Sequence, residues 1–376
     1  MADIEPSLHA ALPLPEQTAL VLQGGGALGS YQAGVFEALA EAGIMPDWIA
    51  GISIGAINAA IIAGNPPGDR TTQLRHFWEE VTAALPSFPV WPSDYMREAL
   101  HQWSAGFVAA FGVPGFFQPR PIPPFIALPG SQAALSFYDS TPLRETLDAY
   151  IDWERINSGA VRLSVGAVNV ETGNFRYFDS ALEPLDARHI MASGALPPGL
   201  PPVEIDGCLW WDGGLVSNTP LQHIVAERDT DMLVFQVDLF SASDIRPATI
   251  DDVLAREKEI RYSSRTRQIT DQFLERSETA SAIRAALNAL PESLCDDPAI
   301  VALKALAEEP ALNIVHLIHK ANAWEGGSRD YEFSRRTMED HWDAGREAVA
   351  ETIRHGDVIA RNIADGKSAA FDLNPV

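Results

Sequence analysis

Cysteine is almost absent from this chain: its 376 residues include two, Cys208 and Cys295. They lie far apart and lack the spacing of metal ligands, which excludes a disulfide framework and favours a reducing compartment. Long apolar runs are also missing, because stretches such as residues 56–63 fall far short of the roughly 20 residues that span a bilayer. The chain does not start with a basic segment followed by an apolar one, so we expect no cleaved signal peptide. These absences predict a cytoplasmic protein.

Positive charge is scarce as well. Lys and Arg together number 27 against 51 Asp and Glu, which gives a formal net charge of −24 at pH 7. A surface that neutralises nucleic-acid phosphates is therefore excluded, and anionic lipid headgroups would be repelled at long range. Any membrane contact must then be local and apolar.

What is present begins with two strand-turn-helix units in tandem. Residues 18–22 are β-prone and stop at a run of glycines, after which apolar residues recur at helical spacing until Gly43. Residues 48–52 form a second apolar strand, and residues 54–63 a second helix. Two such units predict an α/β fold, with helices on both faces of a mostly parallel central sheet.

The rest of the chain divides by composition. We predict an N-terminal tail over residues 1–16, a catalytic domain over 17–242 and a mainly helical extension over 243–376. Further strands are expected at 161–168, 175–178, 232–239 and 314–318, and long helices within 253–290 and 333–363.

The catalytic domain carries an insertion at residues 66–140 that is rich in prolines and aromatic side chains. Its pattern fits two structures, a lid or apolar rim over a site for acyl chains, and a second core packed over the sheet. Its aromatic residues include Phe77, Trp78, Trp91, Trp103, Phe107, Phe111, Phe116, Phe117 and Phe125.

A GxSxG pentapeptide, Gly51 to Gly55, lies between the second strand and the second helix, with Ser53 at its centre. This is the context of a nucleophile elbow, in which a tight turn with small flanking residues projects the serine hydroxyl above the sheet. By itself the pattern also fits a serine that caps a helix between loop glycines.

The first turn contains six small or apolar residues, and its amides suit an anion in two different ways. They fit an oxyanion hole for a tetrahedral intermediate, or a GxGxxG loop that holds a pyrophosphate. A dinucleotide site needs an acidic residue after the second strand, whereas Asp47 precedes that strand and Ser53 follows it, so the oxyanion hole is favoured. The residues are Gly24, Gly25, Gly26, Ala27, Leu28 and Gly29.

A base for Ser53 is offered by Asp212, which is followed by Gly213 and Gly214. Two glycines without side chains let this loop lie close to another loop, so Asp212 can reach the Ser53 hydroxyl directly. Alone, the pattern also fits an Asx turn. Asn218 is expected to bond the backbone of the neighbouring loops.

Together these motifs resemble the patatin-like phospholipase family, which has a glycine-rich loop, a serine elbow on the next unit and a late Asp-Gly-Gly in this order. The stretch 192–202 that leads toward Asp212 is also similar, and residues 243–376 resemble the C-terminal extension of a bacterial subgroup. The resemblance implies a three-layer α/β/α fold, a Ser-Asp dyad and hydrolysis of lipid acyl esters. Many members carry Arg or Lys where this chain has Leu28, which argues against a phosphate bound beside the oxyanion hole.

The mechanism that follows needs no metal and no cofactor, and its partner is a lipid or acyl-ester substrate, not a nucleic acid. Peripheral membrane contact through the aromatic insertion is expected, and homo-oligomers stay open. Three alternatives also stay open: a Ser-Asp-His esterase, a dinucleotide-binding oxidoreductase and a catalytically silent scaffold. Candidate histidines for the esterase are His316, His319 and His341, while His189 and His223 flank the aspartate region and are expected to be structural.

Overall fold

The computed structural model describes residues 14–84, 94–241, 246–291, 294, 297–321 and 325–373. Trp91, Cys295 and most of the N-terminal tail lie outside these ranges.

In this part of the chain, nine strands form one sheet, in the order β11-β10-β9-β1-β2-β5-β8-β7 with β6 paired to β5. The six strands from β11 to β5 are parallel, whereas β6, β7 and β8 add antiparallel pairs at one side. The prediction of a mostly parallel central sheet is therefore confirmed. The strands are β1 (Gln17–Leu22), β2 (Trp48–Gly51), β5 (Arg162–Asn169), β6 (Phe175–Asp179), β7 (Val203–Ile205), β8 (Cys208–Asp212), β9 (Met232–Asp238), β10 (Leu312–Ile318) and β11 (Ala369–Asp372).

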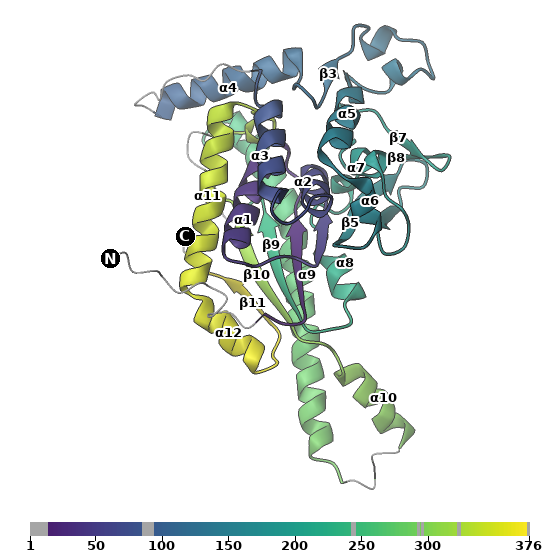
Figure 1. Cartoon of the computed structure of the whole chain (residues 1–376), viewed down its shortest axis with the longest axis vertical. Coiled ribbons are helices and arrows are strands. Elements are labelled where there is room, and N and C mark those ends of the chain that lie inside the picture. Colours follow the sequence, from purple (N-terminus) through teal and green to yellow (C-terminus); the bar gives the residue numbers. More distant parts are fainter. Residues whose placement is uncertain are drawn as a thin grey trace.

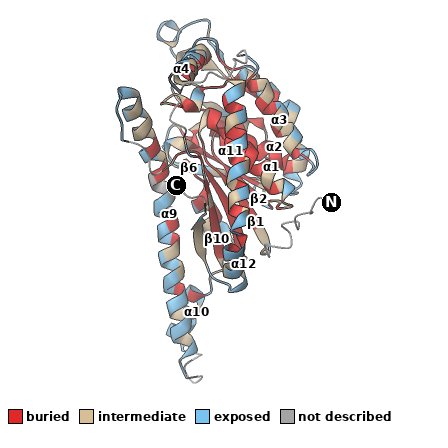
Figure 2. Ribbon diagram, turned by 90° about the vertical axis from the view of Figure 1, so that its left-hand side faces the viewer, coloured by how far each residue is buried: buried red, intermediate tan, exposed pale blue. Residues whose placement is uncertain are grey.

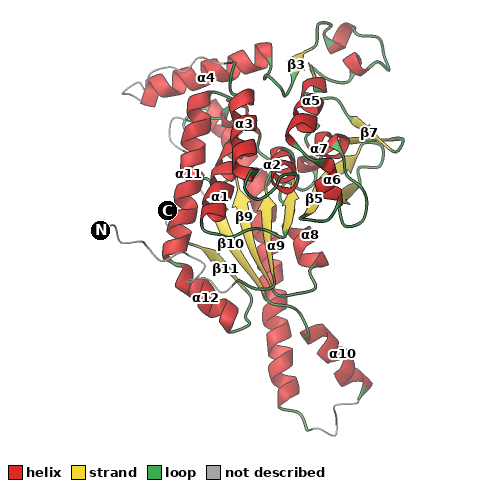
Figure 3. Ribbon diagram, in the orientation of Figure 1, coloured by secondary structure: helices red, strands yellow, loops and turns green. Residues whose placement is uncertain are grey.

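Helices cover both faces of this sheet (Figures 1 and 3). Figure 2 shows α9 on one side and α1, α2 and α11 on the other, so the three-layer arrangement is confirmed. The helices are α1 (Gly29–Glu41), α2 (Ile54–Ala63), α3 (Arg70–Val81), α4 (Asp94–Phe111), α5 (Thr141–Tyr150), α6 (Trp153–Asn157), α7 (Ala187–Ser193), α8 (Leu221–Glu227), α9 (Ile250–Asn288), α10 (Pro298–Ala307), α11 (Arg335–Arg354) and α12 (Gly356–Ala364).

The alternation of β1 shows why two helical layers are needed. Successive side chains of a strand point to opposite faces. Leu20 and Leu22 pack in the larger core with α1, α2 and α11, while Ala19 and Val21 pack in a second core with residues of α8 and α9. A strand that is apolar on both faces has to be covered on both faces.

Residues 243–376 are mainly helical, as expected, and they also supply two strands to the sheet. β10 pairs with β9, and β11 pairs with β10. Helix α11 packs directly on α1, where Gly34 and Gly345 allow the two backbones to approach closely. A Cβ atom on Gly34 would lie 1.9 Å from the Trp342 carbonyl oxygen. This region is thus part of the same core as the first βα unit.

Two parts of the molecule project from the sheet. The far half of α9 and α10 form an arm below the sheet in Figure 1, and α4 with the segment around β3 (Gln118–Pro119), η3 (Pro124–Ile126), η4 (Gln132–Ala134) and β4 (Tyr138–Asp139) lies at the opposite end. Every helix in the described ranges is too short or too polar to cross a membrane.

Candidate active site

Three loops meet at one end of the sheet, and each carries one of the predicted motifs. β1 and β2 are neighbours with Leu22 opposite Gly51, so the glycine loop and the elbow that follow these strands lie side by side. Asp212 ends β8 opposite Ala167 of β5, the strand next to β2. The sheet order thus brings together Ser53 and Asp212, which are 159 positions apart (212 − 53) in the sequence.

Ser53 has the backbone of a strained elbow, with φ 56° and ψ −123° immediately before α2. A non-glycine residue in such a region costs about 1–3 kcal/mol and has to be held by its surroundings. The two flanking glycines permit it, because a Cβ on Gly51 would lie 2.3 Å from the Gly55 carbonyl oxygen, and a Cβ on Gly55 2.3 Å from that of Leu22. The Ser53 amide also donates to Ser193 Oγ at 3.1 Å.

Asp212 is buried, with 2% of its surface exposed, and it lines the same cavity as Ser53. Its Oδ1 accepts a hydrogen bond from the Gly214 amide at 2.7 Å. Burial raises the pKa of Asp212 to about 6, although the nearby Ser53 hydroxyl and the Gly214 amide act in the opposite direction. The group is therefore a better base near neutral pH than an exposed aspartate.

The glycine loop presents three backbone amides that its own helix does not use. The first bond of η2 (Gly26–Leu28) runs from the Leu28 amide to the Gly25 carbonyl, and the Gly29 amide bonds to Gly26. The amides of Gly25, Gly26 and Ala27 precede these bonds and remain at the N-terminal end of the turn. The side chains of Ala27 and Leu28 are buried, so Leu28 belongs to the core and not to the site.

Asn218 ties the aspartate loop to the glycine loop. The side-chain amide of Asn218 donates to the Gly24 carbonyl at 2.8 Å, and the backbone carbonyl of Asn218 accepts from the Gly24 amide at 3.1 Å. A Cβ on Gly24 would lie 2.4 Å from Asn218 Oδ1, so this contact requires glycine. The expected backbone bonding of Asn218 is present.

A buried polar network lies beneath the two turns, and no local pattern in the sequence predicts it. Gln32 donates to the Gln23 carbonyl at 2.6 Å, and Asn58 donates to both Gln32 and the Gly29 carbonyl at 2.9 Å. Trp78 Nε1 donates to Asn58 at 3.1 Å. Satisfied buried networks of this kind hold the loops above them in one geometry.

The motifs open on a cavity of about 190 Å³. Aromatic and aliphatic side chains from the insertion and from the C-terminal region line it together with Ser53, Asp212 and the glycine loop. Among the described residues, no histidine, lysine or arginine lines it. The residues are Gly24, Gly25, Gly26, Ser53, Ile54, Phe116, Phe117, Gly194, Leu196, Leu200, Asp212, Gly214, Asn218, Phe240, Tyr262, Asp330, Tyr331 and Phe333.

The C-terminal wall of this cavity was not predicted. The carbonyl oxygen of Asp330, in η7 (Arg329–Tyr331), would lie 2.0 Å from a Cβ on Gly26, whose φ is +56°. Lys258 of α9 holds the Asp330 carboxylate at 2.8 and 2.9 Å. These contacts join residues far apart in sequence, and a local pattern carries no signal of them.

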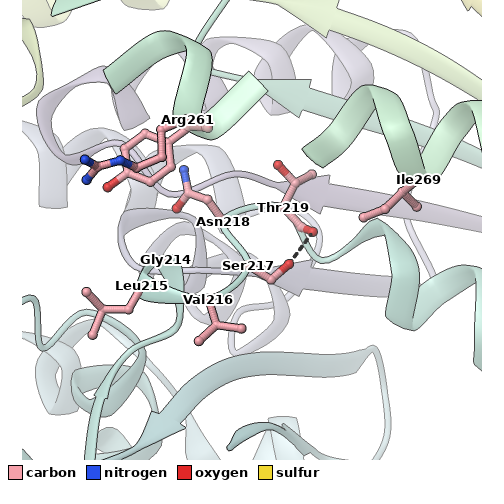
Figure 4. Close-up of a pocket in the computed structure, with 9 residues that line it drawn as sticks. Gly214, Leu215, Val216, Ser217, Asn218, Thr219, Arg261 and Ile269 are labelled. Carbon is pink, nitrogen blue, oxygen red and sulfur yellow. Dashed lines mark hydrogen bonds between the residues drawn. The ribbon is translucent and has the colours of Figure 1, made fainter. Parts of the chain in front are cut away.

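A second cavity of about 250 Å³ adjoins the first and shares Gly214, Asn218 and Tyr262 with it. Figure 4 shows Arg261 at its edge and the hydrogen bond from Ser217 Oγ to the Thr219 carbonyl, 3.4 Å long. The Asp212 loop is therefore bordered by a cavity on each side.

The five candidate histidines all lie beside acidic side chains away from Ser53. His189 completes the cap of α7 with Asp186, and His223 lies 3.1 Å from Asp179. His316 lies 3.4 Å from Asp238, while His319 and His341 both approach Glu325. The geometry therefore offers no support for a Ser-Asp-His triad.

Asp47 is placed against the dinucleotide alternative. Its carboxylate accepts from the Thr18 amide at 2.9 Å, at the start of β1 and β2, which is the end of the sheet opposite the glycine loop. An acidic group for a ribose would be needed at the other end, where Ser53 lies.

Sequence comparisons place the chain in a family. The profile described as "Patatin-like phospholipase" matches residues 20–225, more than half of the chain, and one described as "Patatin phospholipase" matches residues 260–365.

Relatives include patatin-like phospholipase domain-containing protein 6 of Homo sapiens at 28% identity and protein 7 of Mus musculus at 26%, each over 63% of this chain. Lysophospholipase NTE1 of Yarrowia lipolytica is 23% identical, also over 63% of the chain. The matched part spans only 14% of the length of each of these relatives.

Among solved structures, VipD from Legionella pneumophila matches with a TM-score of 0.35 and 15% identity, covering 94% of this chain and 78% of the other. Human GIVD cytosolic phospholipase A2 matches with a TM-score of 0.36 and 12% identity, covering 94% and 62%. The motif order, the fold and the profile match together establish that this chain belongs to the patatin-like phospholipase family.

Proposed function

We propose that the protein hydrolyses carboxylic esters of lipids through a dyad of Ser53 and Asp212. The observation that carries the proposal is the strained Ser53 elbow beside a buried carboxylate with a raised pKa, in a cavity that no histidine of the described residues lines. A nucleophile and its base within hydrogen-bond reach are the minimum for acyl transfer.

The chemical steps follow from these positions. Ser53 Oγ attacks the ester carbonyl carbon while its proton passes to Asp212, and the oxyanion is held by the amides of Gly25, Gly26 and Ala27. The intermediate collapses, and the leaving alcohol takes the proton from Asp212. Water then attacks the acyl-enzyme and gives a proton to Asp212, and the fatty acid leaves as Ser53 regains its hydrogen.

The cavity favours a substrate with a single acyl chain near the ester. Its volume of about 190 Å³ is small beside the ~300–1,000 Å³ of typical ligand pockets, and much of its wall is apolar. Because Leu28 is buried and no cationic residue of the described ranges lines the cavity, a phosphate gains no direct ion pair there. We therefore infer single-chain acyl esters as substrates, and the phosphate of a lysophospholipid would have to lie outside the cavity.

Hydrolysis of a short-chain ester and a lysophospholipid by purified variants tests this function. Ser53→Ala is expected to lower kcat at least about 10⁴-fold, and Asp212→Asn about 10²–10⁴-fold. The exposed Ser158→Ala and Asp229→Asn serve as matched controls with wild-type rates. Substantial turnover by Ser53→Ala would contradict the proposal, and activity only on the short ester would restrict it to simple esters.

We further propose that the insertion docks on a lipid surface. The structure divides its apolar residues: Phe77, Trp78 and Phe116 are buried in the main core, whereas Phe125 is 84% exposed. Phe116 and Phe117 line the cavity, so the same insertion also forms part of the wall of the site. Other exposed apolar residues of this segment are Trp103, Phe111, Ile122, Ile126 and Leu128.

The net charge of −24 disfavours anionic membranes, so the matching surface is zwitterionic. We expect co-sedimentation with phosphatidylcholine vesicles that is lost in a Phe125→Ser, Ile126→Ser, Leu128→Ser variant. A control with Val301→Ser and Leu306→Ser removes exposed apolar residues from α10 and should bind like wild type. Equal binding by both variants would refute docking through the insertion.

A further inference from the structure

Two histidines and a glutamate converge in a second buried cluster, separate from the active site. His319 follows β10, Glu325 lies in the segment before η7, and His341 belongs to α11. All three side chains are buried, and their ligand atoms lie within 4.8 Å of one another. None of them lines the cavity at Ser53.

The distances in this cluster suit a shared ion better than direct hydrogen bonds. Glu325 Oε2 lies 3.3 Å from His319 Nε2, which is the length of a long hydrogen bond, and 3.4 Å from His341 Nε2. Charge-assisted hydrogen bonds are usually about 2.7–2.9 Å long. Tetrahedral ligands at the usual zinc distances of about 2.0–2.2 Å lie about 3.3–3.4 Å from each other.

The hydrogen bonding of the rings points the same way. Among the described residues, neither nitrogen of His341 has a hydrogen-bond partner, and neither does Nδ1 of His319. Buried polar atoms are rarely left without a partner, and each such atom calls for an explanation, such as a bound ion or water. A metal ion would use one nitrogen of each ring.

Glu325 is the carboxylate of this cluster, and its negative charge suits a cation. The neighbouring buried carboxylates have partners of their own, because Glu259 pairs with Arg256 and Arg329, and Glu332 accepts from Ser104 and Ser334. Buried carboxylates require compensation by hydrogen bonds, cations or metals. A divalent ion between His319 and His341 would add to the partners of Glu325.

A surface cavity lies near His319. It has a volume of about 600 Å³ and is lined by Tyr31, Ile318 and Lys320, among others. The Tyr31 ring lies 5.1 Å from that of His319. None of the three cluster residues lines this cavity, so an ion would enter the cluster during folding or after a movement of Tyr31.

We propose that His319, Glu325 and His341 bind one divalent transition-metal ion, with Zn²⁺ as the best match to two imidazoles and one carboxylate. The ion would join the end of β10, the segment before η7 and α11. Its role is structural, because it fixes the segment that carries Asp330 against the glycine loop. Spacing along the sequence predicts no such site, since the three positions form no known motif and meet only in the fold.

Metal analysis of protein purified with a tag free of histidine tests the site. We expect about one zinc per chain, a lower melting temperature after treatment with a strong chelator, and recovery on adding Zn²⁺. Co²⁺ added to the stripped protein should give the visible absorption of a tetrahedral site. A stripped wild type that binds neither ion more tightly than about micromolar would overturn the proposal.

Variants assign the ligands. His341→Gln and Glu325→Gln should each lower the affinity for Zn²⁺ at least about 10-fold. The control is His223→Gln, which removes another partly buried histidine next to a carboxylate and should bind like wild type. Unchanged affinity in both ligand variants would overturn the proposal, and if either fails to fold, the chelator and Co²⁺ experiments on wild type decide it.

Discussion

The regions before and after residue 242 meet at the same cavity, but they contribute to it in different ways. The first supplies Ser53, Asp212 and the glycine loop, whose geometry depends on tight turns and on glycines at fixed positions. The second supplies Tyr262, Tyr331 and other wall residues, which are held by packing and ion pairs between distant segments. The chemistry is therefore local in sequence, and the shape of the cavity is not.

This difference suggests that the two regions have separate roles, and variants can test this division of labour between catalysis and substrate binding. Changes in the first region should act mainly on kcat, because they alter the reacting groups. Changes in the second should act on substrate binding and on the position of the wall. The contact between Gly26 and Asp330 is where the two regions touch directly.

Among the variants that test how the two regions meet, Gly26→Ala is expected to have the largest effect. The new Cβ would overlap the Asp330 carbonyl oxygen, and alanine is disfavoured at φ +56°. Displacement of one oxyanion donor should lower kcat about 10²–10³-fold. Gly68→Ala is the control, since nothing lies within 4 Å of its Cβ position. Equal rates for the two variants would show that the loop does not bind the oxyanion.

The pH dependence of kcat/KM tests the proposed base, Asp212, which belongs to the region before residue 242. Since the base must be ionised and the pKa of Asp212 is raised to about 6, activity should fall about tenfold per pH unit below that value. A carboxyl whose folded pKa is raised stabilises the fold at low pH, and this contribution is lost as the pH rises through about 6. Acid inactivation is therefore not unfolding caused by this group, and circular dichroism should stay native. Full activity at pH 4 would exclude Asp212 as the base.

Lys258→Met probes the second region and should have the smallest effect. It removes the ion pair with Asp330, whose side chains are 28% and 22% exposed. Such pairs are worth about 0.2–1 kcal/mol, or up to about fivefold, and we expect the loss in KM rather than kcat. Lys367→Met, which removes an exposed pair with Asp365, is the control. A kcat loss as large as that of Gly26→Ala would contradict the division of labour.

Much of the fold could be predicted because the strands of the parallel sheet read as short apolar runs between turn residues. The expected strand at 48–52 is β2 (Trp48–Gly51), and the expected helix at 54–63 is α2 (Ile54–Ala63). The short strands β7 and β11 were not predicted, because three or four residues give no periodic signal. The place of β10 beside β9 follows from long-range packing that no local pattern encodes.

For the site, the predicted residues Ser53, Asp212 and the glycine loop lie together, and their catalytic roles stay predictions. The turns that carry them can be recognised in the sequence, because only glycine fits at positions 51 and 55. Phe116 and Phe117 of the wall lie in the aromatic insertion, for which the sequence suggested an apolar rim over the site as one of two structures. Phe240 and Phe333 of the wall cannot be recognised in this way. They are ordinary apolar residues whose role depends on where the chain returns.

Covalent labelling tests the central claim, that Ser53 is the nucleophile and Asp212 its base, most directly. The measurement is the rate of reaction with a fluorophosphonate, followed by peptide mapping of the adduct in wild type and in Asp212→Asn. We expect a single adduct on Ser53 that forms at least about 10²-fold more slowly in Asp212→Asn. An adduct on another residue, or equal rates in the two proteins, would contradict the account.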